Sequence, residues 1–219
     1  MSNRTVLITG CSSGIGRATA YAFLDEEWQV YATARNPADI QKLGEAGCDI
    51  GTIDVTDPED VERVVDRIIE EEGRIDSLVN NAGYGQHGPI EDIDDELFAK
   101  QFEVNVFGPH RLVREVLPHM REREEGTIVN VSSVSGRLAT PGMGPYSASK
   151  HAMEGYSDSL RLEVEPFGID VSVVQPGPVK TEFRERVDDE LGRLDRTDAY
   201  ADLRSEERRV GKECPSPCR

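Results

Sequence analysis

Short apolar runs alternate along the chain with longer segments in which apolar residues recur every three or four positions. The short runs are rich in aliphatic and β-branched residues, which predicts buried strands at 6–10, 29–34, 49–54, 76–80, 127–132 and 170–176. The longer segments predict helices at 14–26, 58–72, 94–123 and 145–166, and more weakly at 38–45. This alternation predicts an α/β fold, a doubly wound parallel sheet with helices on both faces. In such a fold a ligand binds at the carboxyl ends of the strands.

The segment from Pro58 to Glu72 gives the clearest helix prediction. Its apolar residues fall on one helical face: Val61, Val64, Val65, Ile68 and Ile69. Asp57 directly before Pro58 supplies an N-cap followed by proline at the first helical position. We therefore expect an amphipathic helix here, packed on the sheet.

The chain has 219 residues, enough for one domain with a full core. Its 42 acidic and 25 basic residues give a formal charge of -17, which argues against nucleic acid and anionic membranes as partners. Only five of the basic residues are lysine. This composition resembles that of haloarchaea and other salt-loving microbes; the alternative is an ordinary acidic protein.

No apolar run is long enough to span a membrane, and the first residues have no signal-peptide layout. The four cysteines are too scattered for a disulfide framework. The prediction is a cytoplasmic protein.

The C-terminal stretch RSEERRVGKEC, residues 204–214, resembles a translated sequencing adapter. The alternative is a natural charged, disordered tail. We expect one domain at 1–203 and a non-native, disordered tail at 204–219, and we do not interpret Cys214 and Cys218 as a metal pair.

The stretch TGCSSGIG, residues 9–16, lies between the first strand and the first helix. Gly10 can make the turn, Gly14 lets the backbone approach a pyrophosphate, and Gly16 allows close helix packing. The new helix presents free N–H groups and a positive dipole end to the phosphate. The stretch therefore predicts a nucleotide site in a Rossmann-type fold; a plain strand–helix turn is the alternative.

The spacing G-x-x-x-G-x-G resembles the short-chain dehydrogenase/reductase family, and further motifs match along the chain: DVT at 54–56, NNAG at 80–83 and PGPVKT at 176–181. The resemblance implies a nicotinamide cofactor. It places the cofactor-binding residues at Gly10, Ser12, Ser13, Gly14, Ile15, Gly16, Arg35, Asp54, Val55, Asn81, Ala82, Gly83, Tyr146, Lys150, Pro176, Gly177, Val179 and Thr181.

The end of the second strand decides between the two nicotinamide cofactors. NAD-binding folds keep an acidic residue there for the ribose hydroxyls. Here Ala34 occupies that place and Arg35 follows, which suits a 2′-phosphate. We expect NADP(H), with NAD as the possible alternative if Arg35 only faces solvent.

Tyr146 and Lys150 are four residues apart in YSASK, so they share one face of a helix. The pair resembles the catalytic pair of the family, which also implies Ser133, thirteen residues before Tyr146, and Asn105. A nearby ammonium should lower the pKa of Tyr146 from about 10, which helps it exchange a proton. The resemblance implies that Lys150 also holds the cofactor's ribose, that Ser133 contacts the substrate oxygen, and that Asn105 holds a water linked to Lys150.

Purely structural roles are the alternative for these residues. Any of Ser132, Ser133 and Ser135 could be structural, and only the spacing to Tyr146 selects Ser133. Asn105 could hydrogen-bond backbone in a buried helix kink. The histidines show no metal-binding spacing, so no metal site is predicted. For His87 we favour a surface loop over a place facing the substrate.

The expected substrate-lining residues are mostly apolar: Tyr84, Gln86, Leu138, Met143 and Phe183. They favour a hydrophobic alcohol or ketone, and the motifs look most like the hydroxysteroid and retinol dehydrogenase branch. The alternatives are a nucleotide-binding regulator with weak or no catalysis and a sugar-nucleotide epimerase. The resemblance implies a homodimer or homotetramer at full length. We expect the natural part of the sequence to stop near Leu203, before the seventh strand that members of the family have. This predicts a truncated sheet with an exposed edge.

Overall fold

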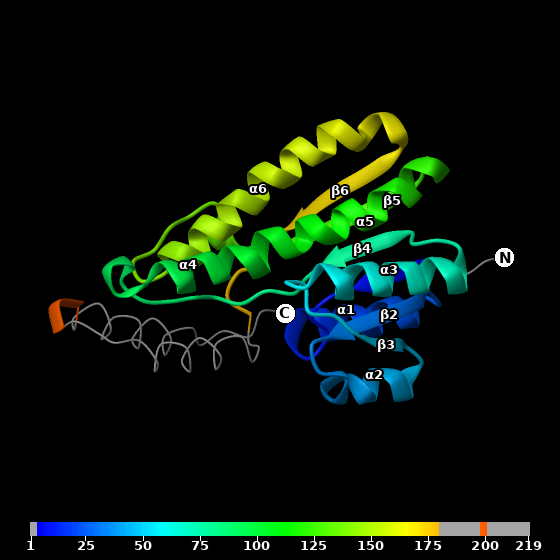
Figure 1. Ribbon diagram of the computed structural model, residues 1–219, viewed down its shortest axis with the longest axis horizontal. Helices are drawn as coiled ribbons and strands as arrows, with labels where there is room; N and C mark the ends of the chain where they lie inside the picture. Colours follow the sequence, from blue (N-terminus) through cyan, green and yellow to red (C-terminus); the bar gives the residue numbers. More distant parts are fainter. Residues whose placement is uncertain (1–3, 180–197, 201–219) are drawn as a thin grey trace.

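The computed structural model describes residues 4–179 and 198–200 (Figure 1). Six parallel strands form one sheet in the order β3-β2-β1-β4-β5-β6. Their bounds are β1 (Thr5–Ile8), β2 (Gln29–Ala34), β3 (Asp49–Thr52), β4 (Ser77–Asn80), β5 (Gly126–Val131) and β6 (Ile169–Val174). The predicted α/β, doubly wound sheet is confirmed. The predictions for Thr181, Phe183 and the segment 204–219 lie outside the described residues.

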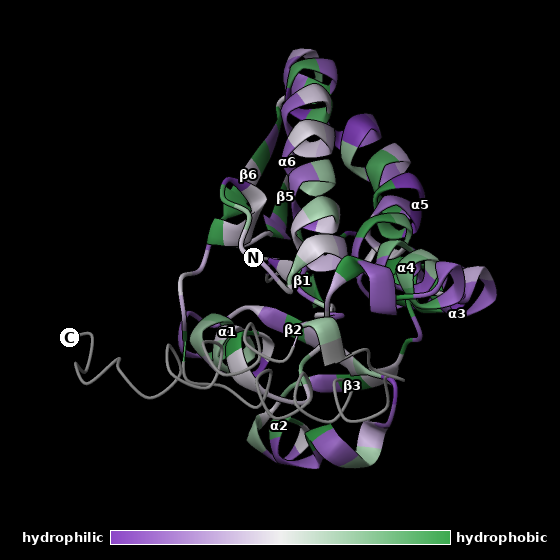
Figure 2. Cartoon of the chain, turned by 90° about the vertical axis from the view of Figure 1, so that its left-hand side faces the viewer, coloured by the Kyte–Doolittle hydropathy of each residue, from purple (hydrophilic) through white to green (hydrophobic). Residues whose placement is uncertain are grey.

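Helices cover both faces of the sheet, with bounds α1 (Gly14–Asp25), α2 (Gln41–Ala46), α3 (Pro58–Glu72), α4 (Asp95–Phe102), α5 (Gly108–Arg123) and α6 (Gly144–Val164). Side chains alternate across each strand, so Leu7 packs with α3, α5 and α6, whereas Val6 and Ile8 pack with α1 and α2. Figure 2 shows α5 and α6 beside β5 and β6, and α2 beside β3.

The strand order reverses beside β1, because the chain runs outward through β2 and β3 and then returns to β4 on the other side of β1. Loops from β1 and β4 diverge at that point, which opens a crevice at the carboxyl ends of the strands. The sheet thus brings the TGCSSGIG and NNAG segments side by side.

The helix predicted from Pro58 to Glu72 forms with those bounds. The Asp57 carboxylate accepts the backbone N–H of Glu59 at 3.0 Å, and Gly73 ends the helix with a φ of 72°. Val61, Val64, Val65 and Ile68 are buried and Ile69 is partly buried against them. Local sequence signals agree with the packing at both ends of this helix.

The single helix predicted at 94–123 is wrong in one respect, because a π-helical turn (Glu103–Phe107) separates α4 from α5. The N–H of Gly108 donates to the carbonyl of Glu103, five residues back, and Pro109 has no N–H to continue the regular ladder. The bulge turns Asn105 into the protein interior, where it is buried.

Candidate active site

The loops after β1 and β4 pack tightly against each other. Gly10 has a φ of 71°, and a Cβ there would lie 2.8 Å from Ala82 Cα. Asn81 Nδ2 donates to the carbonyls of Thr9, at 2.9 Å, and Gly10, at 3.1 Å. Gly16 lies so close to the same Asn81 amide that any side chain would overlap it. Gly10, Gly16, Asn81 and Ala82 therefore build the floor of the crevice.

The N-terminus of α1 opens toward this crevice with features that suit an anion. Ser13 is its N-cap residue but makes no capping hydrogen bond within the described chain, and Gly14 follows with a φ of 54°. The first turn contains no acidic residue. Its N–H groups and positive dipole end can therefore serve a phosphate. Ser12, Ser13, Gly14 and Ile15 are all half-buried.

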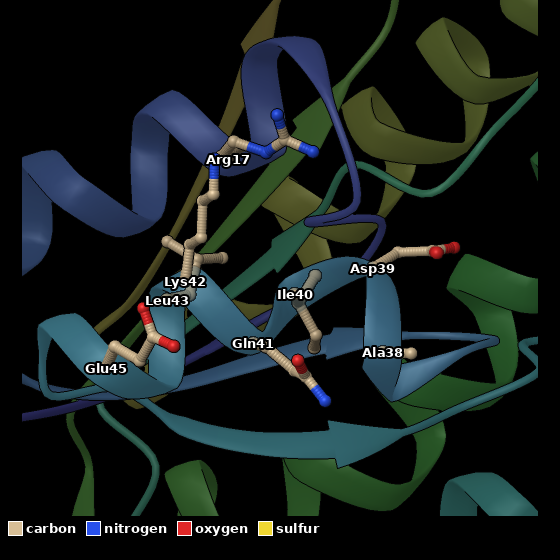
Figure 3. A pocket seen from close by; sticks show the side chains of 8 residues that line it. All are labelled: Arg17, Ala38, Asp39, Ile40, Gln41, Lys42, Leu43 and Glu45. Atoms are coloured by element: carbon tan, nitrogen blue, oxygen red, sulfur yellow. The ribbon is translucent and has the colours of Figure 1, made fainter.

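Cationic side chains gather beside the end of β2. Ala34 is buried and Arg35 is exposed directly after it. The Arg17 guanidinium donates to the carbonyl of Ser12. A cavity of about 300 Å³ separates α1 from the segment 38–45, and Figure 3 shows Lys42 extending toward Arg17 across it. Two acidic residues, Asp39 and Glu45, also line the cavity.

Asp54 and Val55 follow β3 at the same edge of the sheet. Asp54 Oδ1 accepts the backbone N–H of Thr56 at 2.9 Å and its hydroxyl at 2.7 Å. Val55 is buried where a Cβ on Gly108 would meet it at 2.7 Å. Both residues fix the turn before α3, and Asp54 remains half-buried at the crevice.

Tyr146 and Lys150 lie on the same face of α6, with Lys150 Nζ 5.8 Å from the centre of the Tyr146 ring. Ser133, in the loop directly after β5, forms a hydrogen bond with the Tyr146 side chain. Lys150 Nζ donates to the carbonyl of Val131 at 2.7 Å. All three side chains are buried, with exposed fractions of 6% to 8%. The structure brings Ser133, from the loop after β5, together with Tyr146 and Lys150 of α6.

Burial controls the ionisation of this cluster. Burial raises the pKa of Tyr146 above 10, and the hydrogen bond with Ser133 only partly opposes that. Burial also lowers the pKa of Lys150 to about 8, against the attraction of the Glu154 carboxylate. Lys150 Nζ donates to Val131, and desolvation of the phenolate dominates the pKa of Tyr146 in this state. A lowering of that pKa by Lys150 with the cofactor bound stays a prediction.

The Asn105 side chain ties the loop after β4 to α6. Its Oδ1 accepts the backbone N–H of Tyr84 at 3.1 Å, and its Nδ2 donates to the Tyr84 carbonyl at 3.0 Å and to Ser149 Oγ at 3.2 Å. Asn105 therefore makes the backbone hydrogen bonds expected of a residue in a helix kink, through both its amide nitrogen and its amide oxygen.

His87 is a residue that the sequence analysis undervalued. The surface-loop interpretation is wrong, because the ring is half-buried and its centre lies 6.0 Å from that of Tyr146. The Gly88 N–H donates to the carbonyl of Gly142 at 2.8 Å, which holds this loop against the start of α6. No local sequence signal identifies such a contact, since it depends on two distant loops.

The remaining predicted residues line the outer part of the crevice or support it. Pro176 is half-buried, Gly177 and Val179 are exposed, and the Pro176 carbonyl accepts the N–H of Val134 at 3.1 Å. Among the expected substrate-lining residues, Tyr84 and Met143 are half-buried and Leu138 is exposed. Gln86 is wholly buried and donates to the His87 carbonyl at 3.2 Å, so it supports the loop.

Within the described part of the chain, no helix combines the length and apolar character that crossing a membrane requires. The same residues contain no cluster of three or more histidine, cysteine or acidic side chains arranged to hold a metal ion.

The chain is similar to known oxidoreductases along most of its length. An Escherichia coli K12 protein described as an uncharacterized oxidoreductase, YbbO, is 42% identical over 185 residues, covering 84% of this chain and 69% of that protein. Human 17-beta-hydroxysteroid dehydrogenase type 1 is 38% identical over 216 residues, covering 91% of this chain and 64% of the human one. The chain thus spans roughly two thirds of the length of these relatives.

A solved structure of a variant of actinorhodin polyketide ketoreductase with NADPH superposes with a TM-score of 0.81 at 35% identity, covering 87% of this chain and 76% of that one. The sequence model of the short chain dehydrogenase family matches residues 4–192. The resemblance carried by the glycine loop, NNAG and YSASK is thereby confirmed, and the chain belongs to the short-chain dehydrogenase family.

Proposed function

We propose that this protein reduces the carbonyl group of a hydrophobic ketone or aldehyde with NADPH. The observation that carries the proposal is the buried cluster of Ser133, Tyr146 and Lys150 at the carboxyl end of β5, next to the crevice formed by the glycine loop. A phenol, a hydroxyl and an amine on one side of a nucleotide crevice are the groups that carbonyl reduction needs. The oxidoreductase relatives support the same class of reaction.

The residues of the crevice fit a dinucleotide. The α1 N-terminus would hold the pyrophosphate, Asp54 the adenine side, and Asn81 with Ala82 and Gly83 the middle of the cofactor. Pro176, Gly177 and Val179 would contact the nicotinamide end, with Thr181 beyond them. When bound, NADPH supplies the hydride that reduces the carbonyl carbon.

The chain's own groups supply the proton and stabilise the developing charge. Tyr146 Oη donates a proton to the carbonyl oxygen as the carbon accepts the hydride, which gives the alcohol. Ser133 Oγ donates a hydrogen bond to the same oxygen. Lys150 would hold the nicotinamide ribose and would favour the phenolate that Tyr146 leaves behind. Asn105 holds the loop at Tyr84 against α6. A water bound beside it would return the proton from solvent through Lys150.

Arg35 would select NADPH over NADH. A guanidinium can bind a 2′-phosphate bidentately, and buried Ala34 offers no carboxylate to bind the free ribose hydroxyls. Arg17 and Lys42 line the neighbouring cavity, where Asp39 and Glu45 offset their charge, so Arg35 carries the selection. We expect reduction as the physiological direction because NADPH is the usual reductant in the cell.

Initial rates with acetophenone and decanal, using either NADPH or NADH, test the proposal. We expect consumption of NADPH with a kcat/KM on the order of tenfold or more above that with NADH, and Arg35→Ala should remove most of this difference. An exposed arginine on α5, Arg114, gives the control Arg114→Ala. A preference for NADH would contradict the cofactor assignment, and nucleotide binding without turnover would favour a regulator.

A further inference from the structure

Glu154 is a carboxylate buried one helical turn beyond Lys150. Only 4% of the residue is exposed, and both residues lie on the inner face of α6. A residue four positions after Lys150 lies directly above it on the same face. A charge in this position requires compensation, because burying an unpaired carboxylate is costly.

Two loops at the edge of the crevice supply that compensation. Arg137 Nη2 lies 3.1 Å from Glu154 Oε2, and Gln175 Nε2 donates to the same oxygen at 2.8 Å. Arg137 directly follows the turn η4 (Val134–Gly136), whose N-cap residue is Ser133. Gln175 directly precedes Pro176 and Gly177. One carboxylate therefore joins α6 to the loop of the catalytic serine and to the loop expected at the nicotinamide.

The surroundings of Glu154 are close-packed. A Cβ on Gly136 would lie 3.1 Å from Glu154 Oε1 and 2.8 Å from Ser132 Oγ. Both of these oxygens are buried without a protein hydrogen-bond partner among the described residues. Because position 136 is glycine, the carboxylate of Glu154 can pack against the backbone of the serine loop. Its Oε1 has no hydrogen-bond partner among the described residues, so its charge acts on the neighbouring groups.

We propose that Glu154 is a positioning residue that holds the Ser133 loop and the Gln175–Gly177 segment against α6 and keeps the ammonium of Lys150 charged. The inference rests on the proposed function, since it assigns Glu154 a role through Lys150 and Ser133. Its charge acts on Lys150 against the effect of burial, in the direction that retains the proton. Glu154 itself does not touch the reacting atoms.

The charged and titratable groups around Lys150 come from several elements. Tyr146 and Glu154 belong to α6, Arg137 follows β5, and His87 reaches Tyr146 from the loop after β4. Arg137 is 59% exposed, so solvent screens much of its opposing charge, whereas the Glu154 carboxylate is shielded from solvent. The carboxylate should therefore dominate the field at Lys150.

Selective ¹³C labelling of lysine in the full chain tests this role without any need for turnover. The five lysines give few Cε signals, and Lys150→Arg identifies the one of interest. We expect Glu154→Gln, which keeps the shape and removes the charge, to move the Lys150 titration midpoint to lower pH. The control Glu163→Gln removes an exposed carboxylate from the same helix and should leave the midpoint unchanged.

Arg137→Gln separates the two parts of the proposal and remains informative if Glu154→Gln fails to fold. It removes one loop anchor and keeps the carboxylate, so the Lys150 midpoint should stay or rise. NADPH fluorescence titration should show a several-fold weaker Kd, because an ion pair to a buried carboxylate is lost. With Glu154→Gln, the alkaline limb of kcat/KM for decanal reduction should shift with the lysine midpoint.

An unchanged midpoint in Glu154→Gln, or an equal fall in Arg137→Gln, would overturn the inference. Either result can coexist with NADPH-dependent turnover, so the proposed function would stand. A fall in the midpoint in a protein without turnover would support the electrostatic role and count against the proposed function.

Discussion

At the scale of single residues, burial sets the chemistry of the site. Tyr146, Lys150 and Ser133 are almost wholly excluded from solvent, so their ionisation depends on a few neighbours. The hydrogen bond with Ser133 favours the phenolate of Tyr146, and Glu154 favours the ammonium of Lys150, while burial opposes both charged forms. A buried amine kept for catalysis should therefore cost the fold stability.

We expect Lys150→Met to raise the free energy of unfolding near neutral pH by up to about 3 kcal/mol while abolishing turnover. The folded pKa of Lys150 is about 8, below its ordinary 10.5, so the unfolded chain binds more protons between these values. Wild-type stability consequently rises with pH through that window, and the advantage of the variant declines through it.

Urea unfolding of both proteins at neutral pH and near the upper end of the window measures the difference. A difference in unfolding free energy that stays constant with pH would show that Lys150 has an ordinary pKa in the folded protein.

At the scale of elements, the site depends on loops that are held together more than on any one helix or strand. Thr9 Oγ1 accepts the backbone N–H groups of Asn81, at 3.1 Å, and Ala82, at 3.0 Å. The loop after β1 therefore cannot move without the loop after β4. Gly10 lies where the two backbones approach most closely.

We expect Gly10→Ala to weaken NADPH binding on the order of tenfold or more and to destabilise the fold. The new Cβ would meet Ala82 Cα at 2.8 Å, in addition to the strain of a φ of 71°. Gly73→Ala is a matched control, because Gly73 has a φ of 72° and nothing within 4 Å of its Cβ position. Fluorescence titration and thermal unfolding of both variants compare the clash with the strain alone; equal losses in NADPH affinity would contradict the account.

The elements that the sequence predicted well are those in which local signals and packing agree. The helix from Pro58 to Glu72 has its cap, its apolar face and its terminal glycine in the right places, and the structure keeps those bounds. The π-turn at Glu103–Phe107 was missed because helical spacing continues through it, and only the lack of an N–H at Pro109 hinted at a break.

The candidate site shows the same division. Tyr146 and Lys150 were predictable because their spacing places them on one helical face, and the predicted contact forms. The position of His87 beside Tyr146 and the bond from Gln175 to Glu154 were not, because they join loops far apart in the sequence. The burial that raises the pKa of Tyr146 was not predictable either, because spacing carries no information about desolvation.

At the scale of the whole molecule, charge is the dominant feature. Acidic residues outnumber basic ones by 42 to 25, so ion pairs within the chain cannot neutralise all the carboxylates. Many of these acidic side chains lie on exposed helix faces. Like charges on one surface repel each other, and that repulsion opposes the compact state until salt screens it. We propose that the protein forms a homodimer or homotetramer that pairs through the long helices α5 and α6.

We expect the thermal midpoint and the rate of decanal reduction to rise between low and molar potassium chloride. Potassium chloride is compared with an equal osmolality of sucrose, which does not screen charge. Equal midpoints at low and molar salt would contradict adaptation to high salt and favour an ordinary acidic protein.

The proposed function requires the buried phenol of Tyr146 to pass the proton in carbonyl reduction. Turnover of decanal by Tyr146→Phe, measured beside NADPH affinity from fluorescence, tests it most directly. Tyr156→Phe, on the same helix and hydrogen-bonded to His110 at 3.3 Å, is the matched control. We expect Tyr146→Phe to lose turnover to background while it retains NADPH affinity, and we expect the control to remain active. Turnover close to wild type in Tyr146→Phe would contradict this requirement.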